Sequence, residues 1–271
     1  MVKKIFAKTY IYLILFIMYL PILILVAYSF TDTDQVGIWG GFSMNLYRKL
    51  FLNTELVNAV INTLIIALCS AIVSTILGTL GALGAHYSKK RTRKLIESMT
   101  QLPVVNAEIV MALSLAVLVV SLAWSFSFLT LLIGHVVLTI PFVYLNVKPK
   151  LTQMDPFTYE AALDLGAKPG YALYKVILPE ILPGIISGFM ISITLSLDDF
   201  VITQYLKEPS FSTISTYIQT IISKHPVPPE VRALTTLIFL SVLLVVVGNT
   251  IYTNRKSRIT PATSKKRRGG N

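Results

Sequence analysis

Six long apolar stretches constrain this chain more than any other feature of its sequence. Each has about the 20 residues that a helix needs to cross the hydrocarbon core of a bilayer, or more. A backbone in hydrocarbon must satisfy its own hydrogen bonds, so we expect helices and not isolated strands. The predicted fold class is therefore an all-α membrane protein with six transmembrane helices. The expected spans cover residues 11–30, 57–85, 102–122, 128–147, 182–206 and 233–252.

The composition supports this prediction. Charged residues make up only 14% of the chain, against about 25% in a soluble domain, and the mean hydropathy is +0.69. These values argue against a water-soluble enzyme and exclude an intrinsically disordered chain. The single cysteine, Cys69, excludes an internal disulfide and a metal site built from several cysteines.

The first apolar stretch has some features of a cleaved signal peptide, because three lysines precede it and Ala27-Tyr28-Ser29 has the small-x-small pattern. A signal peptide has an apolar region of only about 7–15 residues. This stretch is longer and contains Pro21. We expect it to remain as a membrane anchor.

Basic residues are distributed unequally between the two sides of the membrane. Nineteen of the 24 lysines and arginines lie in the termini and in the connections between spans two and three and spans four and five. The positive-inside rule therefore places both termini in the cytoplasm. We expect the tail Lys265 to Arg268 to lie near anionic lipid headgroups, and nucleic acid is not an expected partner.

Two spans carry rows of small residues at i, i+4 spacing, which allow helices to approach closely in lipid. We expect these two spans at the centre of the bundle and the first span at its periphery. The rows are Ser70, Ser74, Gly78, Ala82 and Ala67, Ala71, Thr75, Thr79 in the second span, and Gly184, Gly188, Ser192, Ser196 in the fifth.

The longest cytoplasmic connection, residues 148–181, predicts a helix-turn-helix at the membrane surface. Asp155 can cap the first helix, with Pro156 at its first position, and Gly166 ends it in a left-handed conformation. A second short helix is expected over residues 169–176.

The first of these helices carries a surface suited to protein docking. Ala161 and Ala162 leave one face nearly flat, and Tyr159, Leu163 and Leu165 flank it. A short amphipathic helix of this kind fits a groove on another protein.

The same loop resembles the EAA loop of ABC importer permeases, whose pattern is EAA, three residues, G, nine residues, I-x-L-P. Here Val176 stands where the family usually has isoleucine. The resemblance implies the type I ABC importer permease fold. It also implies that a separate cytoplasmic ATPase receives the coupling residues Glu160, Ala161, Ala162, Asp164, Gly166, Leu178 and Pro179.

A phosphate-binding loop of the G-x-x-x-x-G-K-[ST] type does not occur in the sequence. We therefore expect this chain to be a non-catalytic subunit without a cofactor of its own. MgATP would be bound and hydrolysed by the partner ATPase.

Two acidic residues, Asp198 and Asp199, lie within the fifth apolar stretch. A carboxylate near the middle of a membrane costs about 2.5–3.5 kcal/mol, so we expect at least one of them to line a pathway for a cationic substrate. On a continuous helix, Asp199 falls near the face of Gly188 and Ser192, and Asp198 falls on a neighbouring face. A helix–helix hydrogen bond or a salt bridge to a partner chain is the alternative. If Asp199 lines the pathway, Asp199→Asn slows uptake and leaves assembly intact.

Further stretches resemble the PotC-type permeases of spermidine/putrescine importers, over most of residues 57–252. They are residues 196–206, 209–218 and 228–238, together with Glu108 to Ala112 and Pro141-Phe142. Asn106-Ala107 departs from the family, which often has proline there. The resemblance implies a polyamine cargo, a homodimeric ATPase, a second homologous permease and an external polyamine-binding protein. Related permeases for iron share much of this pattern, so an iron importer stays open.

Two other classes of protein remain as alternatives. One is a secondary transporter with the two aspartates as its ion site, although no internal repeat is evident. The other is a membrane scaffold or receptor that transports nothing. The remaining polar residues Asn58, Asn62 and His135 are expected to make hydrogen bonds between helices.

Three segments follow from these assignments. Residues 1–56 are a peripheral helix with an external loop, residues 57–253 are the permease core, and residues 254–271 are a basic cytoplasmic tail.

Overall fold

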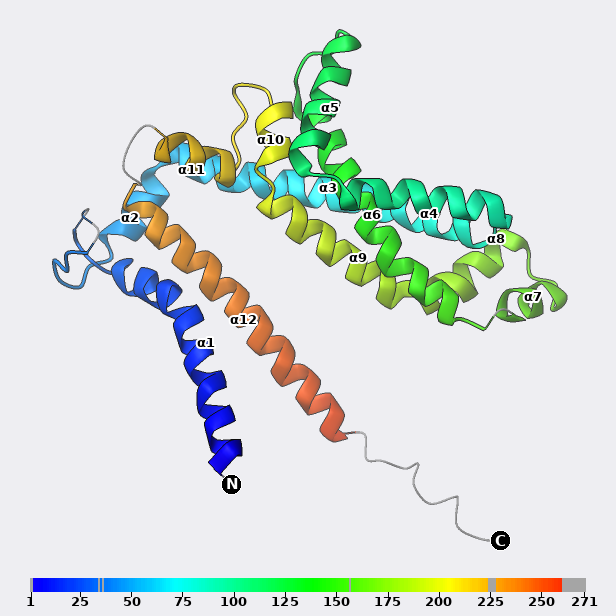
Figure 1. Cartoon of the computed structure of the whole chain (residues 1–271), viewed down its shortest axis with the longest axis horizontal. Helices are drawn as coiled ribbons and strands as arrows, with labels where there is room; N and C mark the ends of the chain where they lie inside the picture. The colour runs from blue at the N-terminus through cyan, green and yellow to red at the C-terminus, as the bar shows by residue number, and fades with distance from the viewer. Residues whose placement is uncertain (1, 34, 36, 156, 224–227, 260–271) are drawn as a thin grey trace. The chain divides into compact units, whose positions relative to one another are not determined.

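The computed structural model describes residues 2–33, 35, 37–155, 157–223 and 228–259, with side chains described between residues 8 and 244. Apart from one isolated bridge between Thr31 and Phe42, the regular structure of these residues is helical. The helices in chain order (Figure 1) are α1 (Val2–Tyr28), α2 (Asn45–Leu52), α3 (Thr54–His86), α4 (Lys90–Val105), α5 (Glu108–Ser121), α6 (Phe128–Gln153), α7 (Phe157–Asp164), α8 (Pro169–Ala172), the π-helical turn η1 (Leu173–Ile177), α9 (Leu178–Asp198), α10 (Val201–Leu206), α11 (Ile214–Ile222) and α12 (Glu230–Ile259).

The chain forms two compact units, one of Met1–Thr54 with His225–Asn271 and one of Glu55–Lys224. The first unit contains α12, which packs against α2 and α1. The sequence-based segments instead assign residues 233–252 to the permease core, and that functional division stays a prediction. Residues 260–271 of the basic tail lie outside the described residues.

Within the first unit, α1 exposes its large apolar side chains, and none of its span over Lys8–Tyr28 is buried. The predicted position of this helix at the periphery of the bundle stays a prediction. Polar bonds join the other parts of the unit: the Asn53 amide donates to Glu230 (3.0 Å), and the Arg232 guanidinium donates to the Thr33 carbonyl (3.4 Å).

Most of the predicted spans correspond to helices long and apolar enough to cross a membrane. Those over Lys8–Tyr28, Thr54–His86, Phe128–Gln153 and Pro169–Asp198 meet this description by themselves. Helices α4 and α5 form a fifth candidate span with a bend of 107°. The sixth predicted stretch lies in α12, whose side chains after residue 244 lie outside the described residues.

The third predicted span, residues 102–122, is wrong as one continuous helix. Helix α4 ends at Val105 and α5 begins at Glu108, because Asn106 and Ala107 have extended backbones with ψ of 147° and 135°. Extended residues cannot continue the i to i−4 hydrogen-bond ladder of a helix. The break falls at Asn106-Ala107, where the sequence departs from the family pattern.

In the second unit α6 packs between α3 and α9, and the predicted rows of small residues make these approaches possible. The Ser70, Ser74, Gly78, Ala82 row and the Gly184, Gly188, Ser192, Ser196 row are buried. Gly78 and Gly188 both face Val143 of α6, and Gly184 faces the Asn146 carbonyl. The small rows of the second and fifth spans are therefore confirmed as packing surfaces, with the fourth span between them.

The packing of α3 on α6 predicts a difference between two glycines of the same helix. A Cβ at Gly78 would lie 2.7 Å from Val143 Cβ, whereas a Cβ at Gly81 would meet nothing within 4 Å. We expect Gly78→Ala to destabilise the protein by about 1–3 kcal/mol through overpacking. The matched control Gly81→Ala should leave stability unchanged or slightly raised, since alanine favours helices. Thermal unfolding in detergent measures both, and equal midpoints would contradict this packing.

Candidate functional site

The Asp155 cap and the end at Gly166 that the sequence predicts for helix α7 are confirmed, while Pro156, its predicted first position, lies outside the described residues. Its first residue, Phe157, donates its backbone N–H to the Asp155 carboxylate (3.0 Å), which caps the helix. After its end, Gly166 has φ +87°. The Gly166 and Ala167 N–H groups then return to the carbonyls of Leu163 and Ala162. This is a Schellman motif, and it explains why glycine follows the helix.

One side of α7 is exposed and combines acidic and apolar groups. Its residues recur at the i, i+3, i+4, i+7, i+8 spacing of a single helix face. Its two large apolar side chains, Phe157 and Leu165, are 69% and 90% exposed. We call this surface the outer face of α7; it consists of Phe157, Glu160, Ala161, Asp164 and Leu165.

The opposite side of α7 lies against the helix bundle. The Tyr159 ring lies 5.2 Å from the ring of Tyr87, which follows α3, and Tyr159 also packs on the core cluster around Leu151 and Ile177. Burial raises the pKa of the Tyr87 hydroxyl, and the nearby Tyr159 raises it further, so Tyr87 is neutral at physiological pH.

The predicted docking face of this loop needs correction. Tyr159 and Leu163 are half-buried and only Leu165 is exposed, so they do not flank one common surface. The two alanines also separate, because Ala161 is exposed and Ala162 is half-buried. Adjacent helix residues point about 100° apart, which places them on different faces.

The second predicted helix of the loop is not a separate element. Helix α8, the turn η1 and α9 follow one another without a break from Pro169 to Asp198. Leu178 packs on the core, and Pro179 lies in the first turn of α9. Because the helix continues into α9 from α8 and η1, the missing N–H of Pro179 removes one helical hydrogen bond there. These two predicted coupling residues thus lie at the start of the fifth span and away from the outer face of α7.

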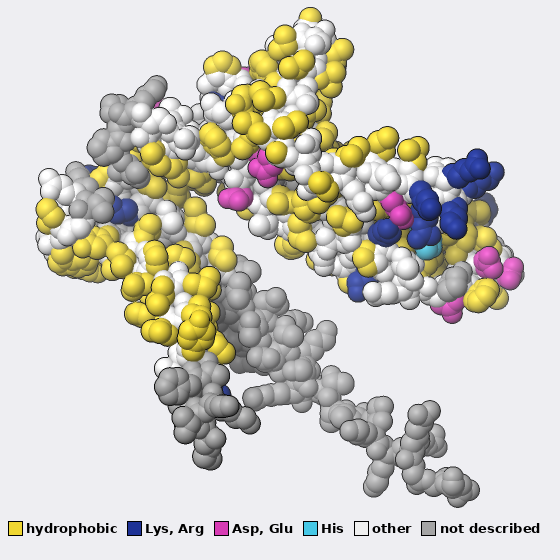
Figure 2. Space-filling model, in the orientation of Figure 1, with side chains coloured by type: hydrophobic (Ala, Val, Ile, Leu, Met, Phe, Trp, Pro, Cys, Tyr) yellow, Lys and Arg dark blue, Asp and Glu magenta, His cyan; other side chains and the backbone are white. Residues whose placement is uncertain are grey.

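Basic side chains gather at the end of the second unit that carries α7, as Figure 2 shows. Among them, Lys148 of α6 and Arg93 of α4 both bind the Glu97 carboxylate, at 2.9 and 3.1 Å. The contact of Lys148 with Glu97 joins α6 to α4, whereas Arg93 and Glu97 lie four residues apart on α4 itself.

The fifth predicted span, residues 182–206, breaks at the acidic pair. Helix α9 ends at Asp198 and α10 begins at Val201. The Asp199 carboxylate accepts hydrogen bonds from the Ile202 N–H (3.2 Å) and from the N–H and hydroxyl of Thr203 (both 2.8 Å). Asp199 therefore caps the first turn of α10, a role that the helix dipole favours.

His135 extends this buried network to other helices. Its Nε2 lies 3.0 Å from the Thr203 hydroxyl and 3.5 Å from the Asp199 carboxylate. Its Nδ1 lies 2.7 Å from the Ser196 hydroxyl, which also accepts a bond from Ser70. The predicted role of His135 in hydrogen bonds between helices is confirmed.

The two aspartates differ in their surroundings. Asp199 is only 6% exposed, whereas Asp198 is exposed at the end of α9. Although α9 ends before it, Asp199 lies against His135, as does Ser196 of the buried row that contains Gly188 and Ser192. This agrees with the expectation that Asp199 lies near the face of Gly188 and Ser192. A pathway role for either carboxylate stays a prediction, and the geometry leaves Asp198 as the side chain able to meet a ligand.

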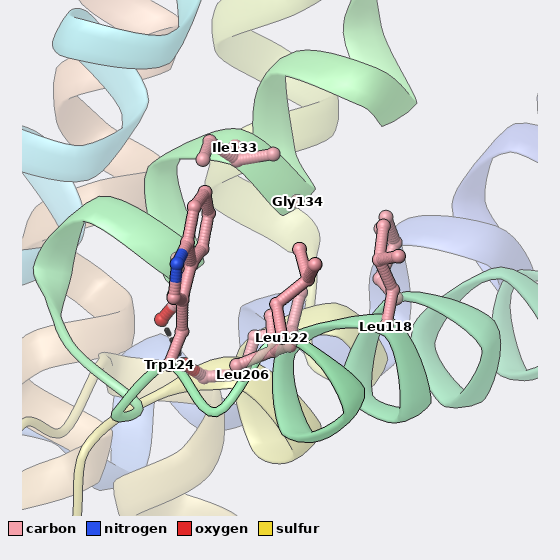
Figure 3. A pocket seen from close by; sticks show the side chains of 9 residues that line it. Leu118, Leu122, Trp124, Ile133, Gly134 and Leu206 are labelled. Atoms are coloured by element: carbon pink, nitrogen blue, oxygen red, sulfur yellow. Dashed lines mark hydrogen bonds between the residues drawn. The ribbon is translucent and has the colours of Figure 1, made fainter.

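A small cavity near the end of α5 has the wrong chemistry for a charged ligand. It measures about 40 Å³ and is lined by apolar side chains, including Leu118, Trp124 and Ile133, as Figure 3 shows. Its wall is closed by a bond from the Thr130 hydroxyl to the Leu206 carbonyl (3.2 Å). The described residues contain no group of three or more His, Cys, Asp or Glu side chains that could hold a metal ion.

Apolar spans, a broken helix with a carboxylate at its end and an exposed surface helix together describe a polytopic membrane protein. Residues 74–261 match the model of the family described as binding-protein-dependent transport system inner membrane component, and the chain belongs to this family.

Curated relatives and solved structures agree with this membership. The chain is 38% identical to the spermidine/putrescine transport system permease protein PotC of Haemophilus influenzae, over 86% of this chain and 91% of that protein. It is 34% identical to the putrescine transport system permease protein PotI of Escherichia coli K12, over 82% and 81%. A solved bacterial ABC transporter that imports the acidic polysaccharide alginate superposes with a TM-score of 0.70 at 19% identity, covering 95% of this chain and 96% of that one. The fold is thus that of type I ABC importer permeases.

Proposed function

We propose that this chain is the permease subunit of an ATP-driven importer of small polyamines. The names of its relatives, with identities of 34–38% over most of both chains, support this cargo. Polyamines carry several ammonium groups, and an exposed carboxylate at a break in a membrane helix is the complementary charge. The observation that carries the proposal is the exposed outer face of α7, the helix that ends at Gly166 in the loop of residues 148–181.

The outer face of α7 is the proposed docking site for a homodimeric cytoplasmic ATPase. Phe157 and Leu165 would fill apolar parts of a groove, and Glu160 and Asp164 would meet polar or basic groups at its rim. The ATPase would bind and hydrolyse MgATP, and its closure would move α7. Because α8, η1 and α9 continue from this loop, that movement would reach the helix that ends at Asp198.

The cargo would pass between this chain and a second, homologous permease. An extracytoplasmic binding protein would deliver it, and a solved relative in fold is a complex with a periplasmic protein. Both termini would be cytoplasmic, which places α7 on the ATPase side of the membrane. Asp198 would contact an ammonium group during passage, while Asp199 and His135 would hold the break between α9 and α10.

The ring contact between Tyr159 and Tyr87 is expected to help transmit movement of α7 to the helix bundle. Such aromatic pairs contribute about 0.5–1.5 kcal/mol. We expect Tyr159→Ala to lower polyamine uptake by about 2- to 10-fold while the ATPase remains bound, and Tyr159→Phe to retain uptake because it keeps the ring. Uptake assays and co-purification measure the two properties. Equal loss in both variants would show that the ring contact does not matter.

The function is tested by ATPase activity of the complete complex in lipid, with its binding protein, across a series of ligands. Spermidine and putrescine are expected to stimulate hydrolysis, and neutral diols of the same length are not. Stimulation by ferric iron and not by polyamines would contradict the proposed polyamine cargo and would still support an ATP-driven importer. A complex that transports without any ATPase would overturn the proposal as a whole.

A further inference from the structure

A polar cavity of about 310 Å³ lies in the second unit, where the first turns of α3 meet the segment before and within α11. Figure 1 shows α11 and the start of α3 at the end of this unit away from α7. The cavity is large enough for a small organic molecule. Its polar lining consists of Glu55, Asn58 and Asn62 of α3 with Ser210, Ser212 and Tyr217.

The α3 side of the cavity is a continuous polar stripe. Glu55, Asn58 and Asn62 occupy positions i, i+3 and i+7, which lie on one face of a helix. The Asn62 amide nitrogen donates to the Ser212 carbonyl (3.1 Å). Because the nitrogen of the Asn62 amide makes this bond, its oxygen remains available to accept a hydrogen bond from another donor.

The opposite wall is held firmly against α3. Besides the bond from Asn62, the Ile214 N–H donates to the Thr63 hydroxyl (2.9 Å). Lys207 turns its ammonium group to the Phe211 carbonyl (2.9 Å) within the same segment. The cavity is therefore a formed site and does not require the segment to move.

The charge of the cavity is negative. Glu55 lines it, no lysine or arginine does, and no ion pair of Glu55 occurs in the part of the chain that the structure describes. A second carboxylate, Glu208, accepts a bond from the lining Ser210 (2.6 Å) and adds negative charge beside the rim. A carboxylate with amide and hydroxyl oxygens matches the three donors of a primary ammonium group. The lining offers one carboxylate and no histidine or cysteine, so a metal ion is a poor match.

We propose that this cavity binds the ammonium end of an alkylamine, as a second cation site separate from Asp198. The inference rests on the proposed polyamine cargo, whose members have a terminal ammonium group at each end. In the proposed orientation the cavity opens on the external side, where cargo arrives from its binding protein. Glu55 supplies the charge, and Asn58 and Asn62 supply neutral oxygens.

Direct binding to the permease–ATPase complex in nanodiscs, without the binding protein, tests the site. Putrescine is titrated calorimetrically in an Asp198→Ala background, so that this second carboxylate does not contribute. We expect Glu55→Gln to weaken binding about tenfold, as loss of a charge-assisted hydrogen bond requires, and 1,4-butanediol not to bind. Asn58→Leu should weaken binding as well.

The control is Asp32→Asn, which removes another exposed carboxylate that the cavity does not contain. It should leave putrescine affinity unchanged. Unchanged affinity in Glu55→Gln, or an equal loss in Asp32→Asn, would overturn the site. If polyamines do not stimulate ATPase activity while putrescine binding depends on Glu55, the cavity is a cation site but the proposed polyamine cargo is wrong. If polyamines stimulate ATPase activity and putrescine affinity does not depend on Glu55, the cargo is supported and only the proposed site is wrong.

Discussion

Reversing one charge on the outer face of α7, with Glu160→Lys, is expected to abolish most transport. Glu160 is exposed at the middle of this face and is the first residue of the family motif. The few residues that dominate a docking surface cluster near its centre and cost about 2 kcal/mol or more when changed, or about 30-fold in affinity. We therefore expect uptake to fall about 30-fold and the ATPase to be lost on purification, with the permease still inserted.

Glu180→Lys is the matched control for this experiment. Glu180 is exposed in the first turn of α9 and lies outside the outer face of α7. It makes the same change of charge near the same loop. Retained uptake with Glu180→Lys and lost uptake with Glu160→Lys would support a specific docking surface. If both variants transport normally, α7 does not dock on the energy-supplying subunit.

The second large effect is a separation of roles between the adjacent aspartates. Asp198→Ala is expected to fold normally and to lower uptake about 10- to 100-fold, because a hydrogen bond to a charged group contributes about 1.5–3 kcal/mol. Asp199→Ala is expected to destabilise the protein by about 1–3 kcal/mol. It leaves the N–H groups of Ile202 and Thr203 without their acceptor.

Thermal unfolding and uptake of correctly folded protein distinguish these two outcomes. Because both oxygens of the Asp199 carboxylate accept hydrogen bonds and an amide has only one accepting oxygen, Asp199→Asn is also expected to destabilise the protein. This differs from the expectation, drawn from the sequence, that Asp199→Asn leaves assembly intact. A stable Asp199→Ala protein with no uptake would place the pathway at Asp199. An Asp198→Ala protein with normal uptake would remove Asp198 from it.

The features predicted well from sequence are those with a strong local cause. Long apolar stretches predict helices, because hydrocarbon leaves the backbone no other partners. Gly166 predicts the end of α7, since its φ of +87° suits glycine. The rows of small residues predict close approaches, because only they leave room for Val143 and the backbone of α6.

The features that sequence could not supply depend on distant partners or on breaks inside apolar stretches. Residues 102–122 and 182–206 are each apolar when averaged over the whole stretch, so hydropathy alone continues a helix through Asn106-Ala107 and through Asp199-Phe200. The capping role of Asp199 had one local signal, a threonine four residues later at Thr203. The contacts of Tyr159 with Tyr87 and of His135 with Ser196 join residues more than 60 positions apart, and no local pattern encodes them.

The central claim is that ATP hydrolysis by a subunit docked on the outer face of α7 drives the uptake of a polyamine. The most direct measurement is uptake of labelled spermidine into proteoliposomes that hold the complete complex, with binding protein outside and ionophores collapsing every ion gradient. The account predicts accumulation only when MgATP is present on the α7 side of the membrane. Accumulation that requires an ion gradient and proceeds without ATP would contradict it.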